Sequence, residues 1–172
     1  MFPIILDLTR LTVMLVGEGD AATRRLALLE EAGATDIRRF TPEHLPGEAD
    51  FDGVSIVMIV DMIEWQAESI AEIARERHIL VNIEDNKPWC DFHFPSMIRR
   101  GSLLLTISTE GKSPALAKRI RKMLEEIFGE EWGSRVDELE AKRVAWKAEG
   151  KDFKTVKRLL NDEIAISGWF KS

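Results

Sequence analysis

The stretch RLTVMLVGEGDAATRRLALLEEAGA, residues 10–34, decides the predicted fold. Residues 12–16 form an apolar run with β-branched side chains, which predicts a buried strand. A glycine-containing turn follows, and residues 21–32 then repeat apolar side chains at helical spacing. Gly33 stands where a glycine commonly ends a helix. The stretch therefore predicts a strand, a tight turn and a helix in direct succession.

The rest of the first half repeats this alternation. The run VSIVMIV, residues 54–60, is apolar throughout and predicts a strand that is buried on both faces, as in a parallel sheet. Two further strands and a helix are predicted at residues 35–40, 79–83 and 64–77. Alternating strands and helices are typical of an α/β, Rossmann-like parallel sheet.

The second half predicts two strands and then helices. The strands are expected over residues 92–98 and 102–108. Ser113 suits an N-cap and Pro114 the first helical position of a helix that follows. Two polar helices are expected over residues 132–148 and 152–165, with Gly150 as the break between them. Their apolar positions are sparse, so we expect them to pack on the α/β body or on a second subunit.

Length and composition indicate a globular protein. The chain has 172 residues, of which 45% are hydrophobic, which favours one domain, or one domain with a small appendage. No apolar run approaches the ~20 residues that span a bilayer, so no membrane association is expected. The opening MFPIILDLTR lacks a basic segment and is not read as a signal peptide. A single cysteine fits a reducing compartment, and a cytoplasmic location is expected.

Charge is distributed unevenly. Residues 1–96 carry 8 Lys and Arg against 18 Asp and Glu, whereas residues 97–122 carry 7 basic residues against one acidic residue. An acidic protein with one basic segment is not typical of a general nucleic-acid binder, and no nucleic-acid partner is expected. The basic segment fits either a small polyanion or a solvated helix face.

The turn GEGDAA, residues 17–22, matches the dinucleotide pattern G-x-G-x-x-A directly after a strand. Its first glycine permits the turn, its second admits a pyrophosphate, and the small Ala22 allows the helix to pack on the strand. A tight turn without a ligand is the alternative. The residues expected to contact the cofactor are Gly17, Gly19, Asp20, Ala21, Ala22, Thr41 and Pro42.

Other features of the turn oppose dinucleotide binding. Glu18 and Asp20 bring carboxylates to a loop that would receive an anion. The acid expected near the end of the second strand is missing, and Arg38 and Arg39 stand there instead. A pair of arginines fits a 2′-phosphate, so the choice between NAD and NADP stays open.

Three segments, FPIILDL (2–8), VGEGDAATRRLALLEEAGA with its Arg24 (16–34) and VNIEDNKPWCDFHFPSMIRRGSLLLTISTEGKSPALAKRIRKMLE (81–125), carry a family resemblance. The chain resembles the N-terminal module of siroheme synthase and the free-standing precorrin-2 dehydrogenase/sirohydrochlorin ferrochelatases. The positions in register are Asn82, Asp85, Phe92, Pro95, Ser96, Ser108, Gly111, Ser113, Pro114 and Ala117.

The resemblance implies an enzyme of siroheme biosynthesis that oxidises the tetrapyrrole precorrin-2 to sirohydrochlorin with NAD⁺. It also implies insertion of Fe²⁺ in some members, and a homodimer. The implied parts are a dinucleotide-binding domain over residues 1–88, a dimerisation region over 89–114 and a helical domain over 115–172. The implied acid/base is Asp85, and the implied substrate-binding residues are Asn82, Ser108, Thr109, Gly111, Lys112, Ser113 and Lys118.

The sequence departs from the family on the dinucleotide side. Glu18 replaces the middle of three glycines, Val60-Asp61-Met62 replaces a small-residue/Thr-Asp pair, and the segment before VSIVMIV is shortened. A non-catalytic or chelatase-only tetrapyrrole-binding relative with a degenerate NAD site is therefore the alternative function.

The cluster around Cys90, Asp91 and His93 raises the hypothesis of a metal site. Metal sites need three or four converging ligands, and a run of near neighbours that includes a strand does not supply them. We therefore expect no metal there and interpret Cys90 as a small buried hydrophobe. If the strand stays regular, Glu84 points to the face opposite Asp85.

Overall fold

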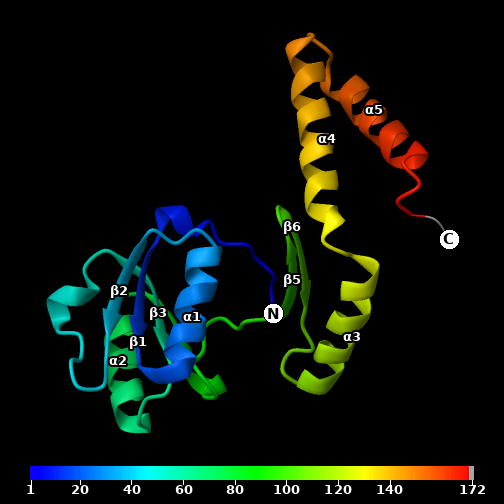
Figure 1. Ribbon diagram of the computed structural model, residues 1–172. Coiled ribbons are helices and arrows are strands. Elements are labelled where there is room, and N and C mark those ends of the chain that lie inside the picture. Colours follow the sequence, from blue (N-terminus) through cyan, green and yellow to red (C-terminus); the bar gives the residue numbers. More distant parts are fainter. Residues whose placement is uncertain (171–172) are drawn as a thin grey trace. The chain divides into compact units, whose positions relative to one another are not determined.

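The computed structural model describes residues 1–170 and divides into two compact units, Met1–Phe94 and a second that starts at Pro95 (Figure 1). The predicted α/β fold class is confirmed by the parallel sheet of the first unit and the helices that follow. The finer division at residues 88 and 114 remains a prediction. No helix within residues 1–170 is long and apolar enough to cross a membrane.

The first unit is a four-stranded parallel sheet in the order β2-β1-β3-β4. Short 3-10 turns occur at Leu8–Arg10, Glu48–Phe51 and Lys87–Trp89. The main elements are β1 (Thr12–Val16), α1 (Gly19–Glu31), β2 (Asp36–Phe40), β3 (Val54–Ile59), α2 (Glu64–Glu76) and β4 (Leu80–Ile83). All six lie within a few residues of the predicted positions. For β1 and β3 the signal is a continuous apolar run, which marks strands that are covered on both faces.

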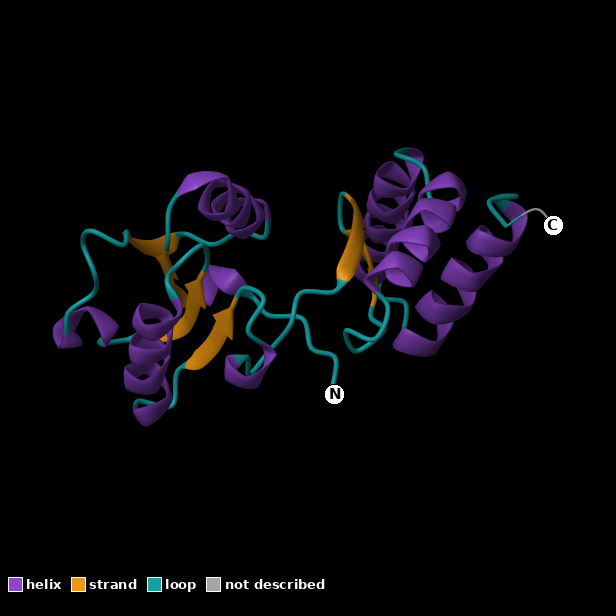
Figure 2. Cartoon of the chain, turned by 90° about the horizontal axis from the view of Figure 1, so that it is seen from below, coloured by secondary structure: helices purple, strands orange, loops and turns teal. Residues whose placement is uncertain are grey.

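Alternate strand residues pack against the two helices, which cover opposite faces of the sheet (Figure 2). Met14 and Val16 join the cluster formed with α2, whereas Val13 and Leu15 join the cluster formed with α1. All four side chains are at most 2% exposed. Because successive side chains of a strand point to opposite faces, this alternation produces one buried cluster on each face of the sheet.

Backbone hydrogen bonds also join the residues that follow the strands to the ends of neighbouring strands. The Gly17 N–H donates to Phe40 O at 3.0 Å, the Val60 N–H to Val16 O at 3.0 Å, and the Glu84 N–H to Ile59 O at 2.9 Å. The chain crosses from β2 over β1 to β3, so this edge holds the topological switch point between β1 and β3. Open parallel sheets bind their ligands at such a point.

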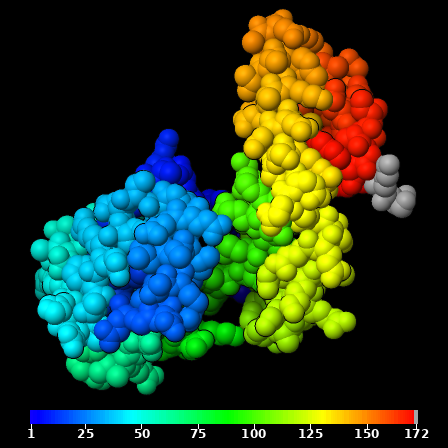
Figure 3. Space-filling view, viewed as in Figure 1, coloured from blue at the N-terminus to red at the C-terminus, as the bar shows by residue number. Residues whose placement is uncertain are grey.

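The second unit combines a hairpin with three helices. Ser113 caps the first helix by accepting a hydrogen bond from the Leu116 N–H at 3.3 Å, as predicted. The two helices that follow lie side by side, the first yellow to orange and the second orange to red in Figure 3. The elements are β5 (Ser96–Arg100), β6 (Leu103–Ile107), α3 (Pro114–Ile127), α4 (Glu131–Ala148) and α5 (Phe153–Ile166).

One local prediction is wrong. The strand expected from Phe92 begins only at Ser96, because the Phe92 carbonyl is bonded to the Asn82 side chain instead of to a neighbouring strand. The predicted strand over residues 79–83 is present as β4, which ends at Ile83, so the condition under which Glu84 would point to the opposite face is not met. Glu84 and Asp85 therefore form a turn, and both are exposed on it.

Candidate functional site

The turn between β1 and α1 requires its first glycine. Gly17 has φ 141°, and a Cβ atom there would lie 2.1 Å from the Val60 carbonyl oxygen. Gly19 has φ 71° and begins α1, while Ala22 is buried against the sheet. The predicted strand, turn and helix are confirmed, and the N–H groups of the first helical turn face the carboxyl edge of the sheet. Such an arrangement can receive a phosphate.

Carboxylates surround this turn. Glu18 precedes α1 without making a side-chain capping bond, and Asp20 is exposed in the first helical turn. The Asp61 Oδ2 atom lies 3.6 Å from the position of a Cβ on Gly19. These negative charges oppose a bound dinucleotide, although water screens those that are exposed.

One of the two arginines at the end of β2 is engaged in the fold. The Arg38 guanidinium donates to the carbonyl oxygens of Asp50 and Asp52, at 2.6 and 2.9 Å, so it is engaged in the fold. Arg39 is exposed. Thr41 follows in an isolated bridge in which its N–H donates to His44 O at 3.3 Å and its carbonyl accepts from the His44 N–H at 3.0 Å. Pro42 follows, half-buried.

A pocket of about 160 Å³ opens at the carboxyl ends of β3 and β4. Asp85 lines it in the left-handed region, with φ 60°, and Asp61 lines it with φ 50°. Its lining residues are Ile59, Asp61, Met62, Ile83, Glu84 and Asp85. Asp85 is exposed, so its carboxylate is accessible to a ligand in this pocket.

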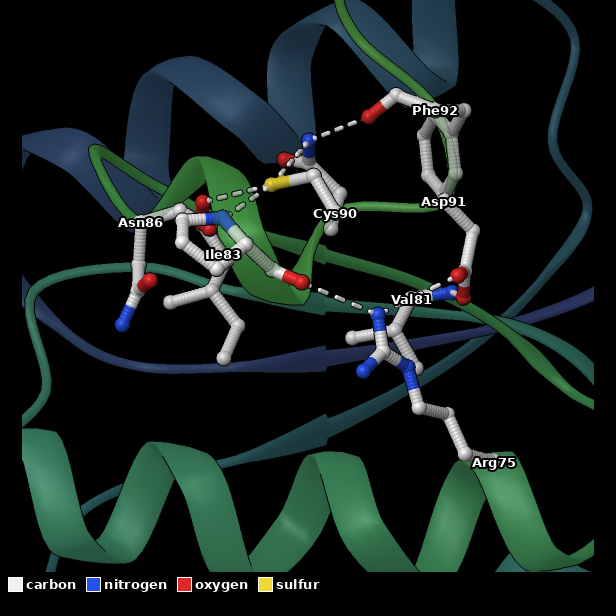
Figure 4. A network of polar contacts seen from close by, with 9 residues as sticks. Arg75, Val81, Ile83, Asn86, Cys90, Asp91 and Phe92 are labelled. Carbon is white, nitrogen blue, oxygen red and sulfur yellow. Dashed lines mark hydrogen bonds and ion pairs between the residues drawn. The ribbon is translucent and has the colours of Figure 1, made fainter.

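Residues 90–92, which follow Asp85 in a loop, are hydrogen-bonded to β4 (Figure 4). The Asp91 N–H donates to Val81 O at 2.8 Å, and the Asp91 carboxylate accepts from the Val81 N–H at 2.9 Å. Arg75 of α2 donates to the same carboxylate at 3.3 Å. Since β4 is an edge strand, these bonds satisfy backbone groups that would otherwise face solvent.

The side chains of Asn82 and Cys90 also hold this loop by hydrogen bonds. The Asn82 amide is 5% exposed and donates to Phe92 O at 2.8 Å. The Cys90 thiol donates to Ile83 O at 3.1 Å and to Asn86 O at 3.3 Å. Burial is the main cause that raises the pKa of the Cys90 thiol. The thiol is therefore neutral near pH 7 and holds the loop as a hydrogen-bond donor.

The histidine and the acids of this segment do not converge on one point. His93 is exposed, and Asp91 is bonded to Val81 and Arg75. Within residues 1–170, no group of three or more His, Cys, Asp or Glu side chains is arranged to hold a metal ion.

Sequence reasoning missed Arg25. Its guanidinium lies between the Glu84 carboxylate, at 3.8 Å, and the Phe94 ring, whose centroid is 3.8 Å from Cζ. The residue reads as one of two adjacent arginines on a helix, and no sequence signal pairs it with the residue before Asp85.

The other predicted substrate residues lie in the second unit, between β6 and the second turn of α3. Ser108 Oγ accepts from the Glu110 N–H at 3.1 Å, and Thr109 Oγ1 accepts from the Ser113 N–H at 3.1 Å. Gly111 has φ 73° at the apex of this turn, and Lys112 and Lys118 are exposed. The six positions therefore share one ordered turn and the helix start that follows it.

The parallel sheet, its glycine turn and the pocket at its carboxyl edge define a Rossmann-like unit. A family model described as "Putative NAD(P)-binding" matches residues 4–96, more than half of the chain, and the chain belongs to that family. A second model, "Sirohaem biosynthesis protein central", matches residues 100–127. The family resemblance inferred from the sequence is confirmed.

Two of the relatives that the chain is similar to are siroheme synthases. The chain is 34% identical over 144 residues to siroheme synthase 1 of Pectobacterium atrosepticum and 33% identical over 143 residues to siroheme synthase of Sodalis glossinidius. Each match covers 73% of this chain and 30% of the relative, so the chain spans about a third of the length of these proteins. In structure it is similar to SirC, precorrin-2 dehydrogenase, with a TM-score of 0.75 at 24% identity, over 95% of this chain and 89% of that one.

Proposed function

We propose that this chain oxidises precorrin-2 to sirohydrochlorin in siroheme biosynthesis, with NAD⁺ as the hydride acceptor. The observation that carries the proposal is the position of Asp85, exposed in a left-handed turn beside the pocket at the carboxyl edge of the sheet. Membership in the NAD(P)-binding family supplies the cofactor class, and the siroheme synthase relatives supply the substrate class.

The dinucleotide would lie on the turn between β1 and α1. Gly17 and Gly19 have no side chain that blocks a pyrophosphate, and the N–H groups at the start of α1 would donate to its oxygens. The bound NAD⁺ supplies the hydride acceptor. Asp20, Ala21, Ala22, Thr41 and Pro42 are the further proposed contacts of the cofactor.

Asp85 is the proposed base. Oxidation of precorrin-2 would remove a hydride and a proton, and the Asp85 carboxylate would accept the proton. No hydrogen bond or ion pair to another described residue engages this carboxylate, so it is available for proton transfer. Asp85 lines the pocket, whose other lining residues are the last residues of β3 and β4 and the loop residues that follow them.

Cations and donors would bind the carboxylates of the tetrapyrrole. The proposed contacts in the second unit are Ser108, Thr109, Gly111, Lys112, Ser113 and Lys118. In the first unit Asn82 is buried and bonded to Phe92 O, so its contribution to substrate binding would come through the loop that it fastens.

The finer parts of the proposal are a homodimer in the cytoplasm and insertion of Fe²⁺ as a second reaction. Exposed apolar side chains on α3, at Leu116, Met123 and Ile127, support a second subunit. The acids around Gly19 support a chelatase that needs no dinucleotide as the second candidate, because they oppose binding of its phosphates.

The test is to incubate the protein anaerobically with precorrin-2 and NAD⁺ and to follow sirohydrochlorin and NADH by absorbance. Equal amounts of both products are expected. A parallel assay supplies sirohydrochlorin and Fe²⁺ or Co²⁺ without NAD⁺. If only the second assay gives product, the chain is a chelatase and the dehydrogenase proposal is wrong.

A further inference from the structure

We propose that Arg25 is a positioning residue that holds the turn carrying Asp85 through the carboxylate of Glu84. This inference rests on the proposed function, because it concerns the same reaction. Arg25 stands on α1, its side chain is 13% exposed, and its Nη2 atom lies 3.8 Å from Glu84 Oε1.

The guanidinium is fixed from a second side by an aromatic ring. Its Cζ atom lies 3.8 Å from the Phe94 centroid, within the range of a cation–π contact. Phe94 in turn packs edge-on against Phe92, with centroids 5.7 Å apart, and Phe92 packs against the core cluster under α1. Arg25 is therefore held between a carboxylate and a ring that is anchored on the core.

Burial has a cost for this charge. Removal of the guanidinium from water is the main cause that lowers the pKa of Arg25, and Glu84 acts in the opposite direction. The guanidinium keeps its charge, and the Glu84 carboxylate beside it offsets part of the cost of burying that charge. An exposed arginine on a solvated helix face would have no such requirement.

The contact connects the two halves of the proposed site within the first unit. The glycine turn leads into α1, which carries Arg25, and Glu84 directly precedes Asp85. The Glu84 backbone is fixed by its hydrogen bond to Ile59 O at 2.9 Å. The ion pair adds a second restraint, on the side chain, at the residue where the turn begins.

Asp85 has no comparable restraint of its own. Asp85 is exposed, and its carboxylate makes no hydrogen bond or ion pair with the described residues. The direction of this carboxylate therefore depends on the turn that carries it. Small displacements of a catalytic group cost large factors in rate, up to about a hundredfold for about 1 Å.

The experiment compares Arg25→Gln, Arg25→Lys and Glu84→Gln with a matched control. The control is Arg77→Gln, which removes the same kind of contacts at the amino edge of the sheet. Arg77 pairs with Asp52 at 3.0 Å and lies 5.8 Å from the Phe51 ring centroid. The readouts are kcat, the KM for NAD⁺, and hydrogen exchange of the amides of residues 84–86.

We expect Arg25→Gln and Glu84→Gln to lower kcat about tenfold with the KM for NAD⁺ changed less than about twofold. Arg25→Lys keeps the charge but loses the contact of the guanidinium with the Phe94 ring, so its kcat should lie between those of the wild type and Arg25→Gln. Exchange at residues 84–86 should accelerate in Arg25→Gln and not in Arg77→Gln.

The proposal is overturned if Arg25→Gln keeps wild-type kcat and wild-type exchange, or if Arg77→Gln lowers kcat as much. These results differ from a failure of the proposed function, which appears as a wild-type protein without precorrin-2 oxidation. In that case the exchange measurement still tests whether Arg25 restrains the turn.

Discussion

The α-carbon of Gly17 lies so close to Val60 that a Cβ atom on it would stand 2.1 Å from the Val60 carbonyl oxygen. Val60 follows β3, and its N–H donates to Val16 O, directly before Gly17. The glycine turn and the end of β3 are therefore in backbone contact. This contact forms the base of the carboxyl edge at which the dinucleotide would bind.

Gly17→Ala should lower the free energy of unfolding by about 3 kcal/mol or more, because neither backbone segment can give way without breaking the strand ends. Gly53→Ala is the control. Gly53 also has a positive φ, 76°, but nothing lies within 4 Å of its Cβ position, so a loss of about 1–2 kcal/mol is expected. Urea denaturation measures both, and equal losses would contradict the account of Gly17.

Removal of the acids around Gly19 should strengthen dinucleotide binding. We expect Glu18→Gln and Asp61→Asn each to lower the Kd for NADH a few-fold at low salt, because each removes a negative charge near the bound phosphates. The gain should shrink as salt rises. Fluorescence titration with NADH at two ionic strengths tests this, and a Kd that rises in both variants would show that the acids contact the cofactor favourably.

Cys90 should make stability depend on alkaline pH. Its folded-state pKa is raised above the ordinary value of 9.0, so the folded protein favours the neutral thiol. The stabilisation is fully present below 9.0 and is lost as pH rises through the folded-state pKa. Urea denaturation across this range should show a downward component in the wild type that Cys90→Ala lacks. Identical pH dependence in the two proteins would contradict the role of the thiol.

The parallel sheet was predictable from the sequence, whereas the loop at its edge was not. Strands buried on both faces leave continuous apolar runs, as in residues 54–60. Gly17 and Gly33 indicate turns, because glycine readily adopts the positive φ that both have in the structure. The strand predicted from Phe92 failed because one contact, from Asn82 to the Phe92 carbonyl, replaces strand pairing there. Such contacts join residues by geometry and leave no periodic pattern.

The candidate site shows the same division. Asp85 was found through the family resemblance, and its place at a strand end agrees with the structure. The pairing of Arg25 with Glu84 joins α1 to the end of β4, and the packing of β1, β3 and β4 brings these two segments together. The spacing of residues along the sequence therefore does not indicate that Arg25 and Glu84 pair.

The central claim is that Asp85 accepts a proton during oxidation of precorrin-2, and Asp85→Asn tests it most directly. Asparagine tolerates a φ of 60° and keeps the shape of the side chain, so folding and NADH binding should stay unchanged. The measurement is the anaerobic rate of sirohydrochlorin formation at saturating NAD⁺. A loss of at least about a hundredfold is predicted, and a wild-type rate in Asp85→Asn would contradict the account.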